Sequence, residues 1–154
     1  YLIAYMGIIQ PRIFSEERNE SSGTTINDEH AAQYLTSSLS VEDASHYWEV
    51  LSNHMLEHKP YLENELRIAD LAEALNLPAN HLSQTINQQA GQNFHDFVNG
   101  YRVAEAQRIL NDSALRHLTM AQVAFEAGFN SQSAFYKHFK NAVGQTPAQY
   151  RKNN

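Results

Sequence analysis

The chain has 154 residues, which is enough for one domain of ordinary size with a tail or a second small element. It contains no cysteine, so disulfide bonds and thiolate zinc sites are excluded, and a reducing cytoplasm is compatible with the composition. A hydrophobic content of 42% suffices for a buried core, whereas a net charge of −6 at pH 7 is unusual for a protein that binds nucleic acid.

The charge is distributed unevenly along the chain. Residues 1–55 carry two basic and eight acidic side chains, which accounts for the whole net charge of −6. Residues 56–100 hold two basic groups against six acidic ones, and from Tyr101 onward the count is seven basic to three acidic. The C-terminal part therefore has the charge expected of a phosphate-facing surface, while residues 56–100 are poorly suited to tight non-specific binding.

The first 40 residues divide into an apolar and a polar segment. Residues 1–14 form an apolar, juxtamembrane-like segment that is too short to span a bilayer, because spanning needs about 20 residues. Two interpretations stay open: the cytoplasmic end of a transmembrane helix of a longer protein, which the lack of an initiator methionine favours, or a buried segment of this domain. Residues 15–40 are polar and acidic, with serine, glycine and threonine at the centre, which predicts a flexible linker.

An amphipathic helix is expected over residues 41–59, where the lysine before Pro60 ends the pattern. We expect this helix to pack against the unit that follows it, with Trp48 as the main anchor. A role in coupling a sensor to the rest of the protein is the alternative. The apolar positions of the helix share one face at helical spacing: Tyr47, Trp48, Leu51 and Met55.

This helix also contains the spacing of an inverted zinc peptidase motif, His54-Met55-Leu56-Glu57-His58. Zinc hydrolysis would need both histidines as ligands, Glu57 as the general base and a third ligand from elsewhere. The spacing of the other six histidines suggests no third ligand, and Pro60 breaks the helix just past the motif. A solvated polar flank is therefore the preferred interpretation of this stretch.

Residues from about 66 to 92 predict a first helix-turn-helix. Its leading helix has apolar positions at helical spacing, and Asn76 tolerates the left-handed backbone that a tight turn needs. Its second helix, from about Ala79 to Gln89, turns Leu82 and Ile86 inward and leaves a polar outer side.

A long helix is expected over about residues 93–110, with Asn93 as its cap. At roughly 1.5 Å per residue it spans about 25 Å, the right scale for a strut between two helices that read DNA segments about 34 Å apart. Gly100 inside this helix costs about 1 kcal/mol relative to alanine.

A second helix-turn-helix is expected over about residues 118–144. Thr119 and Gln122 match a capping box at its start, and Gly128 supplies the left-handed turn that ends the first helix. Asn130 is expected to cap the second helix. The inner face of that second helix is apolar, with Ala134, Phe135 and Phe139, and its outer side is polar and basic.

The two units repeat one pattern, at an offset of 52 residues before the second helix and 53 after it. A chance hairpin would not repeat its turn, its core positions and its glycine exit together. The predicted fold is therefore all-α: two tandem helix-turn-helix subdomains joined by a long linker helix, with an extra N-terminal helix and a C-terminal helix over about residues 146–152. The matching positions are Leu71-Ala72 with Val123-Ala124, Asn76-Leu77 with Gly128-Phe129, Leu82 with Phe135, Ile86 with Phe139, and Gly91 with Gly144.

The stretch from about Pro60 to Arg151 resembles the DNA-binding domain of AraC/XylS-type bacterial transcription regulators, and residues 60–154 are accordingly assigned to one such domain. The N-terminal segment further resembles the junction in membrane-anchored sensors of this family. The elements that carry the main resemblance are Leu71-Ala72, Leu82-Ser83, Gly91, Tyr101-Arg102-Val103-Ala104-Glu105-Ala106, Leu110, Val123-Ala124, Gly128-Phe129, Phe135, Phe139-Lys140, Gly144, Thr146-Pro147 and Tyr150-Arg151.

The first unit departs from the family pattern at its two helix starts. Arg67 stands where a capping serine or threonine is usual, and Pro78 stands where a serine often caps the recognition helix. Because a missing cap costs roughly 1 kcal/mol, we expect the first unit to be the less stable of the two.

The resemblance implies which side chains touch DNA. Arg102 has two alternative roles: a contact to phosphate, or a structural role in which it ties the two units together. The implied base-reading residues are Asn80, Ser83 and Gln84 in the first unit and Gln132, Ser133, Tyr136 and Lys137 in the second; the candidate phosphate contacts are Arg102, Arg116 and Lys140, with Arg108 as a further candidate.

The resemblance also implies the partners. A sequence-specific regulator of transcription would bind double-stranded DNA, contact RNA polymerase and form a possible homodimer. Its N-terminal sensor region would lie outside this sequence, and the regulator domain would be cytoplasmic even in a parent protein anchored in the inner membrane. No catalytic residue, cofactor or metal is expected. A helical protein-interaction or non-specific architectural module is the alternative, favoured by the acidic first unit.

Overall fold

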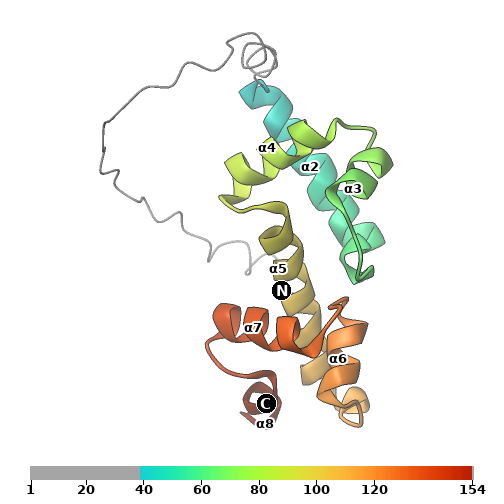
Figure 1. The fold of residues 1–154 in the computed structure, drawn as a ribbon, viewed down its shortest axis with the longest axis vertical. Coiled ribbons are helices and arrows are strands. Elements are labelled where there is room, and N and C mark those ends of the chain that lie inside the picture. The colour runs from blue at the N-terminus through green and yellow to red at the C-terminus, as the bar shows by residue number, and fades with distance from the viewer. Residues whose placement is uncertain (1–38, 154) are drawn as a thin grey trace, which may run out of the picture.

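The computed structural model describes residues 39–153, and within this range every regular element is helical (Figure 1). The predicted apolar segment 1–14 and nearly all of the predicted linker 15–40 lie outside the described residues. No helix of the described part combines the length and the apolar character that crossing a membrane requires.

Two helix-turn-helix units follow one another, α3–α4 and α6–α7, and α5 joins them (Figure 1). This order confirms the predicted all-α fold with two tandem units and a long linker helix. The bounds of the elements are α2 Val41–His58, η1 Pro60–Leu62, α3 Ile68–Ala74, α4 Ala79–Ala90, α5 Phe94–Asn111, η2 Ser113–Leu115, α6 Met120–Glu126, α7 Gln132–Val143 and α8 Pro147–Asn153, where η marks a short 3-10 helix.

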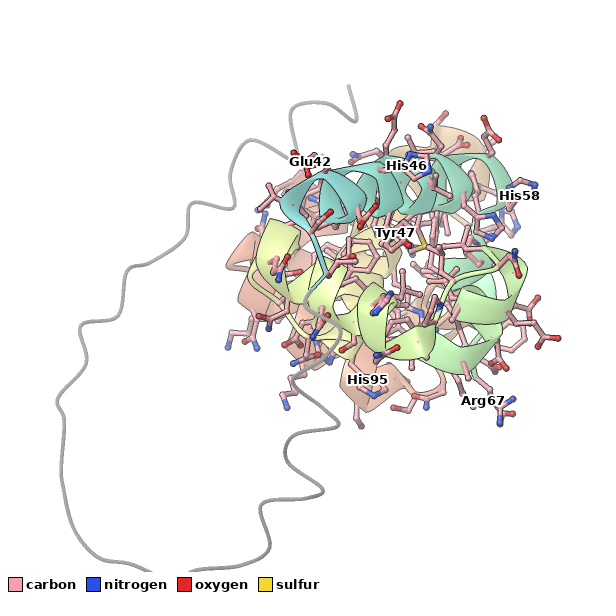
Figure 2. All side chains as sticks on the ribbon, turned by 90° about the horizontal axis from the view of Figure 1, so that it is seen from above. Glu42, His46, Tyr47, His58, Arg67 and His95 are labelled. Atoms are coloured by element: carbon pink, nitrogen blue, oxygen red, sulfur yellow. The ribbon has the colours of Figure 1, made fainter. Side chains whose placement is uncertain are left out.

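The N-terminal helix α2 lies across the second helix of the first unit, α4. It starts at Ser40, whose Oγ accepts a hydrogen bond from the Asp43 amide at 3.0 Å. Leu51 and Met55 are fully buried, whereas Trp48, the expected main anchor, stays partly exposed and packs on a core phenylalanine. Figure 2 shows Tyr47 on the side of α2 that faces α4, where its ring stacks on that of His81 at 6.3 Å.

The hydrophobic interior consists of two separate clusters that divide α5 between them. The N-terminal half of α5 contributes Phe94, Phe97 and Val98 to the first cluster, and its C-terminal half contributes Val103, Ala106, Ile109 and Leu110 to the second. Because the two halves face different partners, the apolar residues of α5 do not form one continuous stripe. The linker helix is therefore a rigid strut whose ends belong to different units.

The turns of the two units are the same Schellman motif. Asn76 has φ 53° and Gly128 has φ 88°, so both adopt the left-handed backbone that the sequence predicts. The amide after each of them donates back to the preceding helix over 2.9 Å, Leu77 to the Ala72 carbonyl in one unit and Phe129 to the Ala124 carbonyl in the other. The predicted repeat of the turn is thus confirmed down to its hydrogen bonds.

One predicted cap is displaced by one residue. Ser131, and not Asn130, caps α7, because the Ser131 Oγ accepts from the Ala134 amide at 3.2 Å. The predicted capping box of α6 is confirmed: the Thr119 amide donates to Gln122 Oε1 at 2.8 Å, and the Gln122 amide donates to Thr119 Oγ1 at 3.2 Å.

The start of α3 shows what replaces a serine or threonine cap at Arg67. The Asp70 carboxylate accepts from the Arg67 amide at 3.0 Å and from the Arg67 guanidinium at 2.6 Å and 3.1 Å. This guanidinium holds the pKa of Asp70 below its usual range, mainly through the side-chain hydrogen bond. Pro78 provides no side-chain cap to α4, as the sequence predicts.

Candidate nucleic-acid interface

The second helices of the two units, α4 and α7, pack against α5 near its opposite ends; in Figure 1, α4 lies above the N-terminal end of α5 and α7 lies at its lower end. The second helix of a helix-turn-helix is the one that enters the major groove. Two such helices on a common strut give a single chain two elements with which to reach two segments of one duplex.

The outer side of α4 is polar and carries no acidic or basic residue. Its inner side is formed by Leu82, Thr85 and Ile86, all of them buried. Helical periodicity then turns the intervening residues outward. All three implied base-reading residues of this unit are exposed: Asn80, Ser83 and Gln84.

The outer side of α7 is polar and basic. Phe135 and Phe139 face the core, and Gln132, Ser133 and Lys137 are exposed. Tyr136 is only partly exposed, because its ring packs edge-on against the Phe135 ring at 5.7 Å. Of the implied base-reading residues of this unit, Tyr136 therefore has the smallest accessible part.

The three implied phosphate contacts fall into two groups. Lys140, in the last turn of α7, and Arg116, after η2, are exposed. Arg102 has only 9% of its surface exposed. Lys140 and Arg116 are therefore accessible to a phosphate group, whereas little of Arg102 is.

Arg102 is buried and bonded to backbone carbonyls, an arrangement that favours the second of its two predicted roles, the structural one. Its Nε donates to the Tyr61 carbonyl at 2.8 Å, and its Nη2 donates to the Glu63 carbonyl at 2.7 Å. Its guanidinium carbon lies 6.0 Å from the centre of the Phe129 ring in the second unit. These contacts correspond to the alternative role, in which Arg102 ties the two units together.

The turn of the second unit lies directly against the first unit. A Cβ added at Gly128 would meet the Leu62 Cα at 2.9 Å and the Tyr61 carbonyl oxygen closer still. Gly128 is therefore required twice, for its left-handed backbone and for the close approach of two segments. The sequence shows the first requirement but contains no local signal of the second.

The two histidines of the peptidase-like motif are near each other. The rings of His54 and His58 stack with their centres 4.5 Å apart, and the pKa of His54 is lowered mainly by burial and then by His58. Within residues 39–153, no group of three or more histidine, cysteine or acidic side chains is arranged to hold a metal ion.

A chain with two helix-turn-helix units and two outward polar helices has the architecture of a DNA-binding protein. The model of a family described as helix-turn-helix domain matches residues 71–153, more than half of the chain. The chain belongs to this family, the AraC-type helix-turn-helix proteins, which are DNA-binding transcription regulators.

Similar proteins agree with this assignment. An uncharacterized HTH-type transcriptional regulator of Staphylococcus aureus (strain COL) is 31% identical over 91 residues, which cover 59% of this chain and 12% of that protein. The DNA-binding domain of AdpA, a global transcriptional factor, has been crystallised in complex with a target DNA. Its sequence is 27% identical to this chain, and the two structures align with a TM-score of 0.58 over 70% of this chain and 90% of that one. A transcriptional regulator of Chromobacterium violaceum with an AraC-type domain has the same fold, with a TM-score of 0.59 at 18% identity over 70% of this chain and 94% of that one.

The chain spans only about 12% of the length of the Staphylococcus aureus regulator. The similarity therefore concerns the DNA-binding domain, and the activity of the whole protein is a matter for proposal.

Proposed function

We propose that this chain binds double-stranded DNA sequence-specifically, with α4 and α7 in two successive segments of the major groove. The observation that carries the proposal is the attachment of both helices to one strut, α5, near its opposite ends (Figure 1), together with the exposure of their polar side chains. The DNA complex of the AdpA domain, which shares the fold, supports it.

The chemistry of the exposed side chains suggests what each unit reads. The amides of Asn80, Gln84 and Gln132 can bond bidentately to adenine, and Lys137 can donate to the acceptors of guanine. Ser133 and Ser83 can bond to either type of base edge, and the accessible part of Tyr136 can contact a thymine methyl group.

The electrostatic contribution comes mainly from the second unit. Lys137 and Lys140 lie on α7, and Arg116 precedes α6, whereas α4 contains no lysine, arginine, aspartate or glutamate. Phosphate contacts supply most non-specific affinity and all of its salt dependence. We therefore expect the second unit to anchor the chain and the first unit to add selectivity.

Selection of binding sites from random duplex DNA tests the proposal. The expected result is a bipartite site whose two halves lie about 10 base pairs apart, one for each recognition helix. Equal affinity for selected and random duplexes would overturn sequence-specific binding. That outcome would favour the second candidate, an architectural or protein-interaction module, for which the excess of acidic residues in 56–100 is the specific observation.

Further parts of the proposal concern the whole protein. We expect it to act through binding and not through catalysis, in the cytoplasm, and to contact RNA polymerase in order to alter transcription. We also propose that the protein forms a homodimer and that the parent protein carries a membrane-anchored sensor region.

A further inference from the structure

Arg102 begins a chain of hydrogen bonds that runs from the first unit to the second recognition helix. Two of its nitrogens are held by the backbone of the segment before α3, through the Tyr61 and Glu63 carbonyls at 2.8 Å and 2.7 Å. Its remaining terminal nitrogen, Nη1, donates to Asn99 Oδ1 at 3.3 Å. The guanidinium is thereby fixed to the first unit and oriented toward Asn99.

Asn99 passes the chain on to α7. Its Nδ2 lies 3.2 Å from Nε2 of His138, whose ring also stacks on Phe129 with the centres 6.4 Å apart. His138 follows Lys137 in the sequence and lies on the half-buried flank of α7. The hydrogen-bond chain therefore ends on the recognition helix itself.

The donor and acceptor roles along these hydrogen bonds follow from the Arg102 guanidinium. A guanidinium can only donate, so Asn99 must turn its oxygen to Arg102 and its NH₂ group to His138. Nε2 of His138 must then accept, which requires a neutral imidazole with its proton on Nδ1. If the Asn99 amide were reversed, two donors would face each other at Arg102.

Both units pack on α5, and the segment before α3 also reaches the second unit directly. Their hydrophobic clusters are separate, and a groove of about 300 Å³ lies between the segment before α3, the first turns of α5 and the start of α7. The close approach at Gly128 is a contact at the turn before α7. The hydrogen bonds through Asn99 add a contact on α7 itself.

We propose that Arg102, Asn99 and His138 form a relay that sets the position of α7 relative to the first unit, and that neutral His138 thereby determines which spacing of the two DNA half-sites the chain accepts. This inference rests on the proposed bipartite binding. His138 is a positioning residue in this scheme, since it acts through the helix that carries Gln132 and Lys137.

Burial favours the neutral form of His138. Burial lowers the pKa of His138 most, Lys137 on α7 and Arg102 on α5 lower it further, and Asp96 on α5 opposes them. Since its pKa lies below the ordinary 6.5, the relay is intact at and above that pH and is lost as pH falls through the lowered value. Protonation makes Nε2 a donor that faces the NH₂ group of Asn99.

The experiment measures affinity for a selected bipartite duplex and for duplexes with one base pair added or removed between its halves. The parent chain should bind the altered duplexes at least about tenfold less tightly than the selected duplex. For His138→Leu, whose side chain has no acceptor, the affinity for the altered duplexes should be less than about threefold below that for the selected duplex. His138→Gln restores an acceptor and should keep the parent's preference. His117→Gln, an exposed histidine of the same unit, serves as the matched control and should also keep it.

A second variant tests the relay without removing the imidazole. In Asn99→Asp, the carboxylate accepts from Arg102 and from a protonated His138, so the relay survives acid. As the pH is lowered from about 7.5, the parent should lose its spacing preference once the pH falls through the lowered pKa of His138, and Asn99→Asp should keep its preference at that pH. This comparison decides the question even if His138→Leu does not fold.

The outcomes separate the two proposals. A spacing preference in His138→Leu equal to the parent's, or a parent preference that survives the protonation of His138, overturns the relay while bipartite binding stands. A parent that binds all spacings equally at neutral pH overturns the bipartite binding, and the relay with it.

Discussion

A buried hydroxyl lies in the core of the first unit, on the inner side of α4. Thr85 is 0% exposed, and its Oγ1 has no hydrogen-bond partner among the described residues. An unpaired buried hydroxyl costs about 1–3 kcal/mol, whereas valine has nearly the same shape and no polar atom. Thr85→Val should therefore raise the free energy of unfolding by about 1 kcal/mol in urea titrations.

Thr146→Val is the matched control for this substitution. The Thr146 Oγ1 accepts from the Gln149 amide at 3.3 Å and donates to Gln149 Oε1 at 2.9 Å, so its loss should lower stability by about 1 kcal/mol. A loss of stability in Thr85→Val as large as in Thr146→Val would show that the Thr85 hydroxyl has a partner after all.

The exposed side chains of α7 are the proposed base readers of the second unit. Gln132→Ala and Lys137→Ala should each weaken binding to the selected site by about 1–3 kcal/mol and relax the preference at one position. Fluorescence anisotropy titrations with the selected site and its single-base variants measure both effects. Gln88→Ala, an exposed glutamine near the end of α4, is the control. Unchanged affinity in both α7 variants would remove these residues from the set of base readers.

At the scale of the element, the turn between α6 and α7 is the most constrained segment. Gly128 and Gly144 both have positive φ, 88° and 81°, but a Cβ meets backbone atoms of the first unit only at Gly128. Gly144→Ala should cost about 1 kcal/mol for the left-handed backbone, and Gly128→Ala about 3 kcal/mol or more because two segments must also move apart.

Thermal and urea unfolding of the two glycine variants give the comparison. Equal losses of stability would mean that the turn can move away from Tyr61 and Leu62 at little cost, and the contact between the units would then be loose.

The helices themselves were predictable because their signals are local. The left-handed turns at Asn76 and Gly128 are recognisable from the few residues around them. The apolar spacing of α4 and α7 is recognisable from residues within the same helix. The cap of α7 was misplaced by one residue, because Asn130 and Ser131 are both good caps and only the backbone geometry selects Ser131. The capping box of Thr146 and Gln149 was missed, although its spacing is that of Thr119 and Gln122.

At the scale of the whole molecule, charge separates the two units. Lys140→Ala should weaken binding to selected and random DNA alike and reduce the slope of log affinity against log salt by about 1, because a phosphate contact releases a counterion without reading sequence. Binding isotherms at several salt concentrations measure the slope.

Lys59→Ala is the control for the salt series, since Lys59 pairs with Glu105 at 3.8 Å at the end of α2. It should leave the slope unchanged. A slope for Lys140→Ala equal to that of the parent would exclude a phosphate contact at Lys140.

The arrangement of the candidate interface was only partly predictable. The base-reading positions on α4 and α7 are implied by the family resemblance, and the structure leaves most of them exposed; whether they read bases stays a prediction. The role of Arg102 was left open, because an arginine on a helix can face phosphate or a backbone carbonyl with the same local sequence.

The sequence by itself determined that this chain contains two repeated helix-turn-helix units on a long helix, because apolar periodicity, caps and left-handed turns are encoded by close neighbours. Only the tertiary structure decided how the units meet. The bonds of Arg102 to Tyr61 and Glu63 and of Asn99 to His138 join residues that are 41, 39 and 39 positions apart. Such contacts depend on the packing of whole helices, which no short stretch of sequence specifies.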